Sequence, residues 1–212
     1  MPRVLPYGDH GLLLELGSLT EAQAAYRAVR ALVAGGELPT PVDVVPGART
    51  VLVAGLDRGA APSWQAALGA LRPDAAAPLP VESGVETVIT VRYDGRDLAE
   101  VAAEWGCSTA AVVDRHLAAA FTVAFCGFAP GFAYCTADPP LPPVRRLAEP
   151  RRSVGAGSVA LGGEFCGVYP RAMPGGWRLV GTTDAVLFDP DREPAALLRP
   201  GDHLRFTAGG RP

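Results

Sequence analysis

The sequence predicts an α+β chain of two domains, a small α/β sandwich over residues 1–83 followed by a small antiparallel β-barrel over residues 84–212. Helix and strand patterns alternate in the first part, whereas short apolar runs separated by turn residues fill most of the second. A stretch rich in proline and alanine, residues 72–84, lies between them and is typical of a linker. With 212 residues, the chain can bury a sound core without disulfides or metal.

The first domain is expected to contain strands and helices in the order β-α-β-β-α. The strands lie at residues 11–16, 42–45 and 50–54, and the helices at residues 20–34 and 62–71. Glu21 in the first turn and the pair Gly35 and Gly36 at the end mark the limits of the first helix. Ser63 is a candidate N-cap of the second helix. This order supplies a small two-layer sandwich.

The second domain is expected to begin with a strand and two helices and to continue as strands. Residues 87–93 alternate as in a strand, residues 97–105 and 108–119 are helical, and residues 121–125 return to strand. Short apolar runs then follow between turn residues, at 159–161, 177–180, 185–188 and 203–206. Such runs are typical of a small antiparallel barrel.

The charged residues exclude several classes of function. All 19 basic residues are arginine, and without lysine the chain can form no Walker A loop, Schiff base or lysine nucleophile. With a formal net charge of -3, the chain lacks the excess of positive charge that is typical of a general nucleic-acid-binding protein. We therefore expect no nucleic-acid partner, and any ATP that the reaction uses must be handled by something other than a P-loop in this chain.

The cysteines and histidines do not predict a metal site. The four cysteines form no CxxC pair, and the three histidines follow no zinc-finger spacing relative to them. Buried free thiols in a reducing compartment are the preferred interpretation. The sequence has no apolar run of membrane-spanning length and no signal-peptide pattern at its start. We expect a cytoplasmic protein with no membrane partner.

Residues 126–181 carry the clearest functional signal. Glycines and prolines are dense here and alternate with aromatic residues and arginines. Glycine permits positive φ and close approach of the backbone, while proline fixes φ, so this composition describes rigid loops that present a surface. A binding site is the favoured interpretation, and a set of tightly turned barrel loops is the alternative.

Several short motifs in and after this region occur in a characteristic order. They are GFAPGF at 127–132, PRR at 150–152, GAGSV at 155–159, VYP at 168–170, PGGW at 174–177, LFD at 187–189 and PGDHLRF at 200–206. The chain thereby resembles the family that contains the B subunit of bacterial 5-oxoprolinase, allophanate hydrolase subunit 1 and the inhibitor of a sporulation histidine kinase. The resemblance implies a small N-terminal α/β domain followed by a cyclophilin-like β-barrel. Three positions depart from the family pattern, since Gly155 replaces a proline, Phe121 a tyrosine and Thr182 an arginine.

The resemblance also implies a function. Members of this family act as one component of a complex that uses ATP to open 5-oxo-L-proline to L-glutamate, alongside an A-like and a C-like protein of the same 5-oxoprolinase. Because the chain has no P-loop and no convincing nucleophile and base, we expect it to be inactive in isolation and to bind no cofactor alone. One alternative is the carboxyltransferase half of a biotin-dependent urea or amide carboxylase, with biotin as cofactor. The other is a non-enzymatic inhibitor that docks on a histidine kinase.

His116 and Arg151 are the candidate catalytic residues. His116 matches a histidine of the family, and its imidazole could relay a proton near neutral pH; a histidine that fixes its helix by hydrogen bonding is the alternative. Arg146 and Arg151 match two spaced arginines of the family, and a guanidinium suits bidentate binding of a small carboxylate, bicarbonate or carbamate. The alternative for the arginines is a solvated loop or a salt bridge to Glu149 or Glu164.

Glycine-rich and aromatic positions complete the expected site. Segment 155–158 could point backbone N–H groups at an oxyanion, with Ser158 as an orienting hydroxyl, although a tight β-turn would have the same sequence. Aromatic side chains would form the walls of a pocket, and prolines would stiffen its loops. The expected substrate-binding residues are Phe128, Pro130, Gly131, Phe132, Arg146, Gly157, Ser158, Tyr169, Pro174, Gly175 and Trp177.

Overall fold

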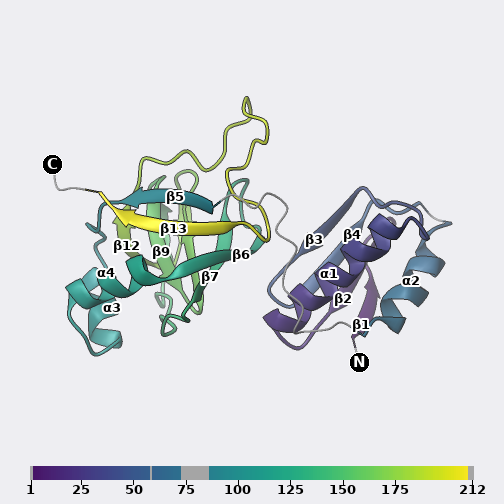
Figure 1. Ribbon diagram of the computed structural model, residues 1–212, viewed down its shortest axis with the longest axis horizontal. Coiled ribbons are helices and arrows are strands. Elements are labelled where there is room, and N and C mark those ends of the chain that lie inside the picture. The colour runs from purple at the N-terminus through teal and green to yellow at the C-terminus, as the bar shows by residue number, and fades with distance from the viewer. Residues whose placement is uncertain (1, 58, 73–85, 210–212) are drawn as a thin grey trace. The chain divides into compact units, whose positions relative to one another are not determined.

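The computed structural model describes residues 2–57, 59–72 and 86–209 (Figure 1). The fold is mixed α/β and mostly sheet, and its internal contacts group into two compact units, Met1–Pro80 and Val81–Pro212. The expected boundary after residue 83 and most of the expected linker lie outside the described residues. Within the described part of the chain, no helix is long and apolar enough to cross a membrane.

The first unit contains one sheet and two helices. Its elements are β1 (Arg3–Pro6), β2 (Gly11–Glu15), α1 (Leu19–Gly35), β3 (Asp43–Pro46), β4 (Thr50–Ala54) and α2 (Ala61–Ala70). The strands form an antiparallel sheet in the order β1-β2-β4-β3. Strand β1 is an addition to the expected order, because its 4 residues, the last of them proline, are too few to show an alternating pattern.

One face of this sheet carries the core of the first unit, and both helices pack against it. Alternate residues of β2 and β4 are buried, among them Leu14 and Val51. They form one apolar cluster with Val29 of α1 and Trp64 of α2. The first unit is therefore a two-layer sandwich, as the order of its elements predicts.

Local hydrogen bonds explain where the two helices begin and end. The Ser18 hydroxyl accepts a hydrogen bond from the Glu21 N–H at the start of α1, and Gly36 ends this helix with a φ of 70°. The expected cap at Ser63 is wrong, since α2 begins directly after Ala60. The Ser63 hydroxyl instead donates to the Ala60 carbonyl oxygen at 2.8 Å from inside the helix.

The second unit is built around a large curled sheet. Its elements are β5 (Glu86–Val91), α3 (Leu98–Glu104), α4 (Thr109–Ala118), β6 (Ala120–Cys126), β7 (Ala133–Asp138), β8 (Arg151–Val154), β9 (Ser158–Gly162), β10 (Phe165–Val168), β11 (Met173–Gly175), β12 (Arg178–Thr182) and β13 (His203–Ala208). The sheet has the strand order β12-β9-β10-β7-β6-β13-β5, and β11 pairs separately with β8. Strands β7, β8, β10 and β11 go beyond the expected set, because they are short or interrupted by polar residues, glycine or proline.

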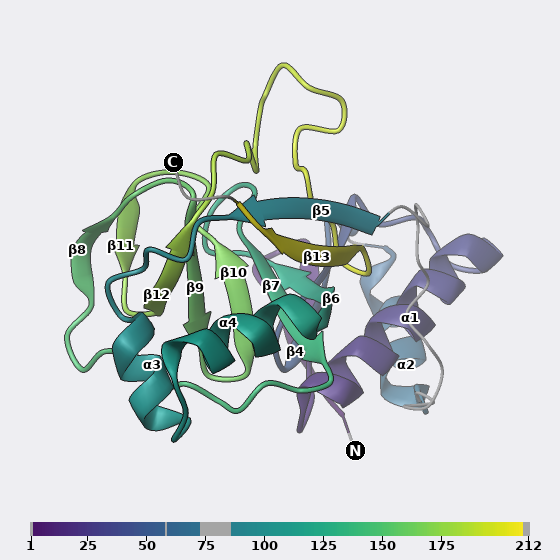
Figure 2. The same ribbon diagram turned by 60° about the vertical axis from the view of Figure 1, so that its left-hand side comes forward.

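The sheet curls as a half-barrel until its two edge strands touch at one point. The backbone of Arg92, just after β5, and that of Thr182, at the end of β12, exchange two hydrogen bonds of 2.8 Å. The expected all-antiparallel arrangement is wrong, because β5 and β13 pair in parallel. These first and last strands of the unit lie side by side in both ribbon views (Figures 1 and 2). Their direction depends on the long connection before β13, which local sequence patterns do not specify.

This long connection between β12 and β13 projects from the sheet (Figure 2). The expected strand at residues 185–188 is wrong, because Phe188 alone pairs there, in an isolated bridge with Ala196. Arg192 holds the connection together, since its guanidinium donates to three backbone oxygens at 3.0 to 3.2 Å. These acceptors are the carbonyl groups of Val186, Pro194 and Ala195.

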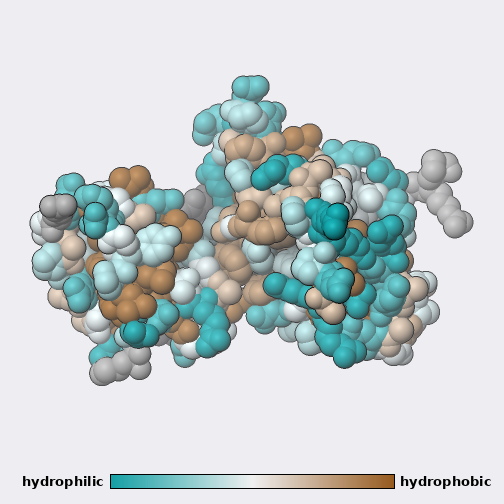
Figure 3. Space-filling view, turned by 180° about the vertical axis from the view of Figure 1, so that it is seen from behind, coloured by the Kyte–Doolittle hydropathy of each residue, from teal (hydrophilic) through white to brown (hydrophobic). Residues whose placement is uncertain are grey.

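Helices α3 and α4 pack against each other and against the curled sheet. α3 contacts β12, and α4 contacts β13. Val101 and Val112, one from each helix, are buried in a core with strand residues such as Phe121 and Leu204. On the face shown in Figure 3, apolar residues emerge between hydrophilic ones on both units.

Candidate functional site

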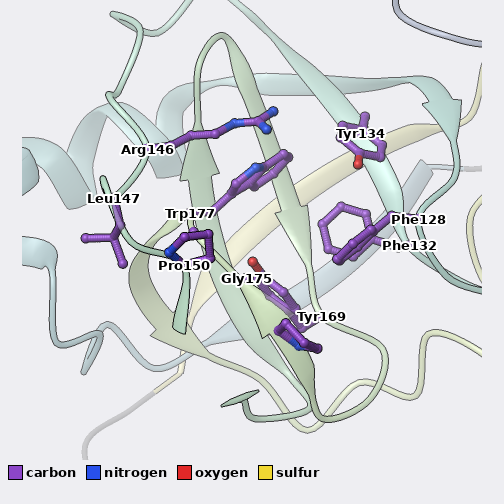
Figure 4. A pocket seen from close by; sticks show the side chains of 11 residues that line it. Phe128, Phe132, Tyr134, Arg146, Leu147, Pro150, Tyr169, Gly175 and Trp177 are labelled. Carbon is purple, nitrogen blue, oxygen red and sulfur yellow. The ribbon is translucent and has the colours of Figure 1, made fainter. Parts of the chain in front are cut away.

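The second unit holds an open cavity of about 300 Å³ among its aromatic loops (Figure 4). Its walls come from the loop before β7, from β7 itself, from the loop before β8, and from β11 and the chain on either side of it. The lining residues are Phe128, Phe132, Tyr134, Arg146, Leu147, Pro150, Tyr169, Pro174, Gly175, Gly176 and Trp177. The volume is at the small end of the range for ligand pockets and suits a compact molecule.

Phe132 stands at the centre of the aromatic lining. Its ring is buried and meets four neighbouring rings edge to face, with centroid distances of 5.1 to 5.6 Å. These neighbours are Phe128, Tyr134, Tyr169 and Trp177. Because each ring restricts the others, the walls of the cavity are preorganised.

Two glycines make room for these rings. An added Cβ at Gly162, on β9, would lie 2.6 Å from the Trp177 indole. An added Cβ at Gly175 would strike the Tyr169 hydroxyl. Both positions therefore need a residue without a side chain, because an aromatic side chain approaches the backbone closely at each of them.

Arg146 brings positive charge to the cavity. Its guanidinium carbon lies 5.6 Å from the centroid of the Trp177 ring, which is the geometry of a cation–π contact. Within the described residues Arg146 forms no ion pair, whereas the adjacent Arg145 pairs with Glu104 at 3.3 Å. The lining contains no aspartate or glutamate among the described residues, so the electrostatics of the cavity favour an anion.

Tyr134 and Tyr169 add hydroxyl groups to the same cavity. Burial raises the pKa of Tyr134, and the positive charge of Arg146 partly opposes this. Burial also raises the pKa of Tyr169, against a backbone hydrogen bond at Trp177 and the charge of Arg146. Both phenols are therefore protonated at neutral pH and can donate hydrogen bonds.

The loop before β7 holds Phe128 in an uncommon backbone conformation. Its φ is 71°, and among the described residues no other non-glycine residue has a positive φ. The Ala129 N–H donates to the Gly127 carbonyl oxygen at 2.8 Å, which closes a three-residue γ-turn around Phe128. The residue is 61% exposed at the rim of the cavity. Strain of this kind persists where the surrounding structure imposes it, often beside a binding site.

Pro130 and Gly131, two expected substrate-binding residues, lie in this loop but outside the described cavity lining. Gly131 has a φ of 80°, and an added Cβ there would lie 2.6 Å from the Cβ of Phe188. Gly131 therefore lets the loop turn and pack closely on the long connection before β13.

Arg151, one of the two expected catalytic residues, is one half of an ion pair and is not among the residues that line the cavity. Its Nη2 donates to both carboxylate oxygens of Asp97, at 2.6 and 2.9 Å, and its Nη1 donates to the Trp177 carbonyl oxygen at 3.2 Å. Asp97 is 4% exposed and also accepts the Leu179 N–H at 2.8 Å. The pair thus anchors the chain that carries Trp177. Asp97 lies 54 positions from Arg151 in the sequence, whereas the predicted salt-bridge partner was Glu149 or Glu164.

His116 is fully buried in the core of the second unit, outside the cavity lining. Its Nδ1 lies 2.9 Å from the Tyr93 hydroxyl and its Nε2 lies 3.3 Å from Cys166 Sγ. Its ring also packs against Phe121 and Phe206. Burial lowers the pKa of His116 to about 3, so the ring is neutral at pH 7. These contacts favour the structural histidine of the alternative interpretation over a proton relay near neutral pH.

Gly157 and Ser158 form a tight turn before and into β9. The Gly157 N–H donates to the Tyr169 carbonyl oxygen at 2.8 Å, and the Ser158 N–H donates to the Gly155 carbonyl oxygen at 3.3 Å. Gly157 adopts a φ of 74°, which the turn requires. Both of these N–H groups are therefore bonded within the chain, as in the tight β-turn of the alternative interpretation.

The cavity also contains residues that the sequence analysis missed, namely Tyr134, Leu147, Pro150 and Gly176. A signal for Tyr134 exists, because it lies two positions after Phe132 at the start of β7, and alternate residues of a strand share a face. The other three lie outside regular strands, where no periodicity predicts which way a residue faces.

All four cysteines are free, and three of them have thiols of raised pKa. Burial raises the pKa of the Cys126 thiol to about 12, and it raises the pKa values of the fully buried Cys135 and Cys166 as well. Thiols in this state are protonated at neutral pH, and only the thiolate is a good nucleophile or metal ligand. The described residues contain no cluster of histidine, cysteine and acidic side chains that could hold a metal ion.

Comparison with known proteins gives the relationships of the chain. Residues 2–198 match the family described as carboxyltransferase domain, subdomain C and D. The chain belongs to this family. Over 113 residues it is 51% identical to the B subunit of 5-oxoprolinase from Escherichia coli O157:H7, a match that covers 53% of this chain and 52% of the relative. Over 113 residues it is 42% identical to the corresponding 5-oxoprolinase protein of Bacillus subtilis (strain 168), covering 53% and 47%. The chain thus spans about half the length of the curated relatives it matches.

Solved structures share the fold of this carboxyltransferase-domain chain. A crystal structure of TTHA0988 matches with a TM-score of 0.72 at 34% identity, covering 100% of this chain and 41% of that one. The conserved uncharacterized protein PH0987 from Pyrococcus horikoshii matches with a TM-score of 0.56 at 28% identity, covering 99% and 98%. The K. lactis urea amidolyase matches with a TM-score of 0.71 over 98% of this chain and 15% of that one. Its identity of 19% indicates a shared fold alone.

Proposed function

We propose that this chain is a B-type subunit of a complex that uses ATP to open 5-oxo-L-proline to L-glutamate. The observation that carries the proposal is its identity of 38% to 51% with curated proteins named as the B subunit of 5-oxoprolinase. The cavity supports it, because a small cyclic carboxylate suits both the aromatic walls and the charge of Arg146.

In this proposal the chain supplies a binding surface, and partner proteins carry the ATP-dependent steps. The sequence contains no lysine and hence no Walker A loop. In this proposal Arg151, paired with Asp97, and His116, bonded to Tyr93, hold the fold, and the side chains of the cavity meet the ligand. We assign the remaining chemistry to an A-like and a C-like protein of the 5-oxoprolinase complex, and we expect no cofactor on this chain alone. The curled sheet would be a cyclophilin-like barrel, and the complex would work in the cytoplasm, where free thiols stay reduced.

Reconstitution with the natural partners tests this assignment. The chain is co-purified with its A-like and C-like partners, and glutamate release from 5-oxoproline is measured with and without ATP. We expect ATP-dependent release by the assembled complex and neither hydrolysis nor ATPase activity from the highly purified single chain. Steady hydrolysis by the single chain would show that the active site is complete here. Absence of release from every combination of the three proteins would overturn the proposal.

The alternative role in a biotin-dependent urea carboxylase has weaker support. The K. lactis urea amidolyase and urea carboxylase resemble this chain at 19% and 18% identity. Identities this low indicate a shared fold alone. The role of a kinase inhibitor stays a prediction from the family resemblance. We therefore favour the oxoprolinase assignment.

A further inference from the structure

We propose that Tyr134 and Arg146 together select the ligand of the cavity, and that they select a small ring carrying one carboxylate and no ammonium group. The inference rests on the proposed function, because it describes the ligand of the same site. It assigns a specificity role to Tyr134 and predicts that the cavity discriminates against zwitterionic amino acids.

The charge distribution of the cavity supplies the first argument. Arg146 stacks on Trp177 and has no carboxylate partner in the described part of the chain, whereas Arg151 is neutralised by Asp97. The described lining contains no acidic side chain. A carboxylate would therefore gain a charge-assisted hydrogen bond, while an ammonium group would meet a cation without a counter-charge.

The fixed position of the Tyr134 hydroxyl supplies the second argument. Its ring is stacked on Phe125 with a centroid distance of 4.3 Å, and it meets Phe165 and Trp177 edge to face at 5.7 and 5.4 Å. The hydroxyl makes no hydrogen bond to another described residue. Figure 4 shows Tyr134 and Arg146 on the same side of the cavity, with Trp177 next to Arg146. A held donor without an acceptor, in the same cavity as a guanidinium, is suited to a carboxylate.

The shape of the cavity supplies the third argument. Phe132 and Trp177 stand at 77° to each other with centroids 5.5 Å apart, and aromatic and proline side chains make up most of the remaining wall. Such walls favour a compact ring over a flexible polar chain. About 300 Å³ holds a five-membered ring with its carboxylate.

This selection would also separate the substrate of the proposed reaction from its product. Hydrolysis of a cyclic amide adds one water, which turns the ring nitrogen into an ammonium group and the ring carbonyl into a second carboxylate. The product thus gains a positive charge that the cavity does not match, and it loses the ring. Binding of the cyclic acid and release of the opened acid follow from the same two side chains.

Titration of the purified chain with four small molecules, followed by NMR chemical-shift changes, tests the inference. Cyclopentanecarboxylate and 5-oxoproline are rings with one carboxylate, 2-pyrrolidinone lacks the carboxylate, and L-proline adds an ammonium group. We expect the two acids to bind at least roughly tenfold more tightly than the other two. Arg146→Gln and Tyr134→Phe should each weaken the two acids by roughly tenfold without affecting 2-pyrrolidinone. Arg152→Gln, an exposed arginine on β8, is the matched control and should bind like the unchanged chain.

The outcomes separate this inference from the proposed function. If 2-pyrrolidinone or L-proline binds as well as the acids, or if Tyr134→Phe has no effect in a chain with an unchanged spectrum, the inference is wrong. If cyclopentanecarboxylate binds and 5-oxoproline does not, Arg146 and Tyr134 still select a ring carboxylate, but the rule must exclude a ring amide, and the oxoprolinase assignment fails at this site. If no acid binds while the complex with Arg146→Gln releases glutamate at the normal rate, the inference fails and the proposed function stands.

Discussion

The aromatic cavity and the surroundings of His116 are two regions of one unit in which polar groups meet aromatic rings. Around His116, both ring nitrogens have partners, the Tyr93 hydroxyl and the Cys166 thiol, and the ring has no exposed surface. In the cavity, Arg146 and Tyr134 turn their polar groups toward open space, without a carboxylate or hydrogen-bond partner among the described residues. Polar groups that satisfy one another stabilise the fold, whereas those left facing a cavity are available to a ligand.

The two arginines that match the family pattern differ in the same way. Arg151 pairs with the buried Asp97 and supports the backbone of Trp177, while Arg146 covers the ring of Trp177 and faces the cavity. Loss of Arg151 should therefore affect folding first, and loss of Arg146 should affect binding first.

The largest effect is expected from breaking the buried ion pair. Arg151→Ala should lower the free energy of unfolding by about 3 kcal/mol, because it leaves the Asp97 carboxylate buried without its cation. Urea unfolding followed by near-UV circular dichroism measures this. Arg152→Ala, the next residue on β8 and exposed, is the control and should change stability by less than about 0.5 kcal/mol. Equal stability of the two variants would mean that Arg151 is not a structural anchor.

A second effect concerns the space beside the Tyr169 ring. Gly175→Ala should cost about 2 kcal/mol, because the new methyl group meets the Tyr169 hydroxyl in a packed wall. Gly176→Ala is the matched control, since its nearest neighbour, Pro150, would lie 3.6 Å from the added atom. Thermal unfolding of both variants gives the comparison. An unchanged melting temperature for Gly175→Ala would show that the wall is looser than these contacts indicate.

The third effect depends on pH. The pKa of His116 is about 3 in the folded chain and near its ordinary value of 6.5 when unfolded, so the unfolded state binds a proton that the folded state does not. The contribution of neutral, buried His116 to the free energy of unfolding is complete above pH 6.5. It is lost as the pH falls toward 3, at about 1.4 kcal/mol per pH unit. His116→Gln should remove this slope from unfolding free energies measured between pH 7 and 5. An equal slope in both proteins would show that His116 titrates normally.

The part of this architecture that follows from local periodicity could be predicted from the sequence. The helix of residues 20–34 and the strand of residues 50–54 appear within a few positions as α1 and β4, because capping residues and β-branched alternation are local signals. The parallel pairing of β5 with β13 was missed, since strand direction depends on connections far apart in the chain.

The candidate site was predicted in its composition more than in its geometry. Aromatic residues and Arg146 do gather around one cavity, because glycine and proline spacing marks the loops that carry them. The partner of Arg151 could not be predicted, since Asp97 lies on a distant segment beside α3. The burial of His116 could not be predicted either, because the sequence of its helix does not show which strands elsewhere in the chain pack against it.

The smallest effect is expected at the rim of the cavity. Phe128 is 61% exposed and has a φ of 71°, so its ring adds little to the core while its backbone is strained. Phe128→Gly should be more stable than Phe128→Ala by about 1 kcal/mol, because both lose the ring and glycine alone relieves the positive φ. Thermal unfolding measures this difference, and titration with cyclopentanecarboxylate should show weaker binding in both variants. If both variants instead unfold far more easily than the unchanged chain, Phe128 belongs to the core, and the contrast between a satisfied interior and an open cavity fails at this residue.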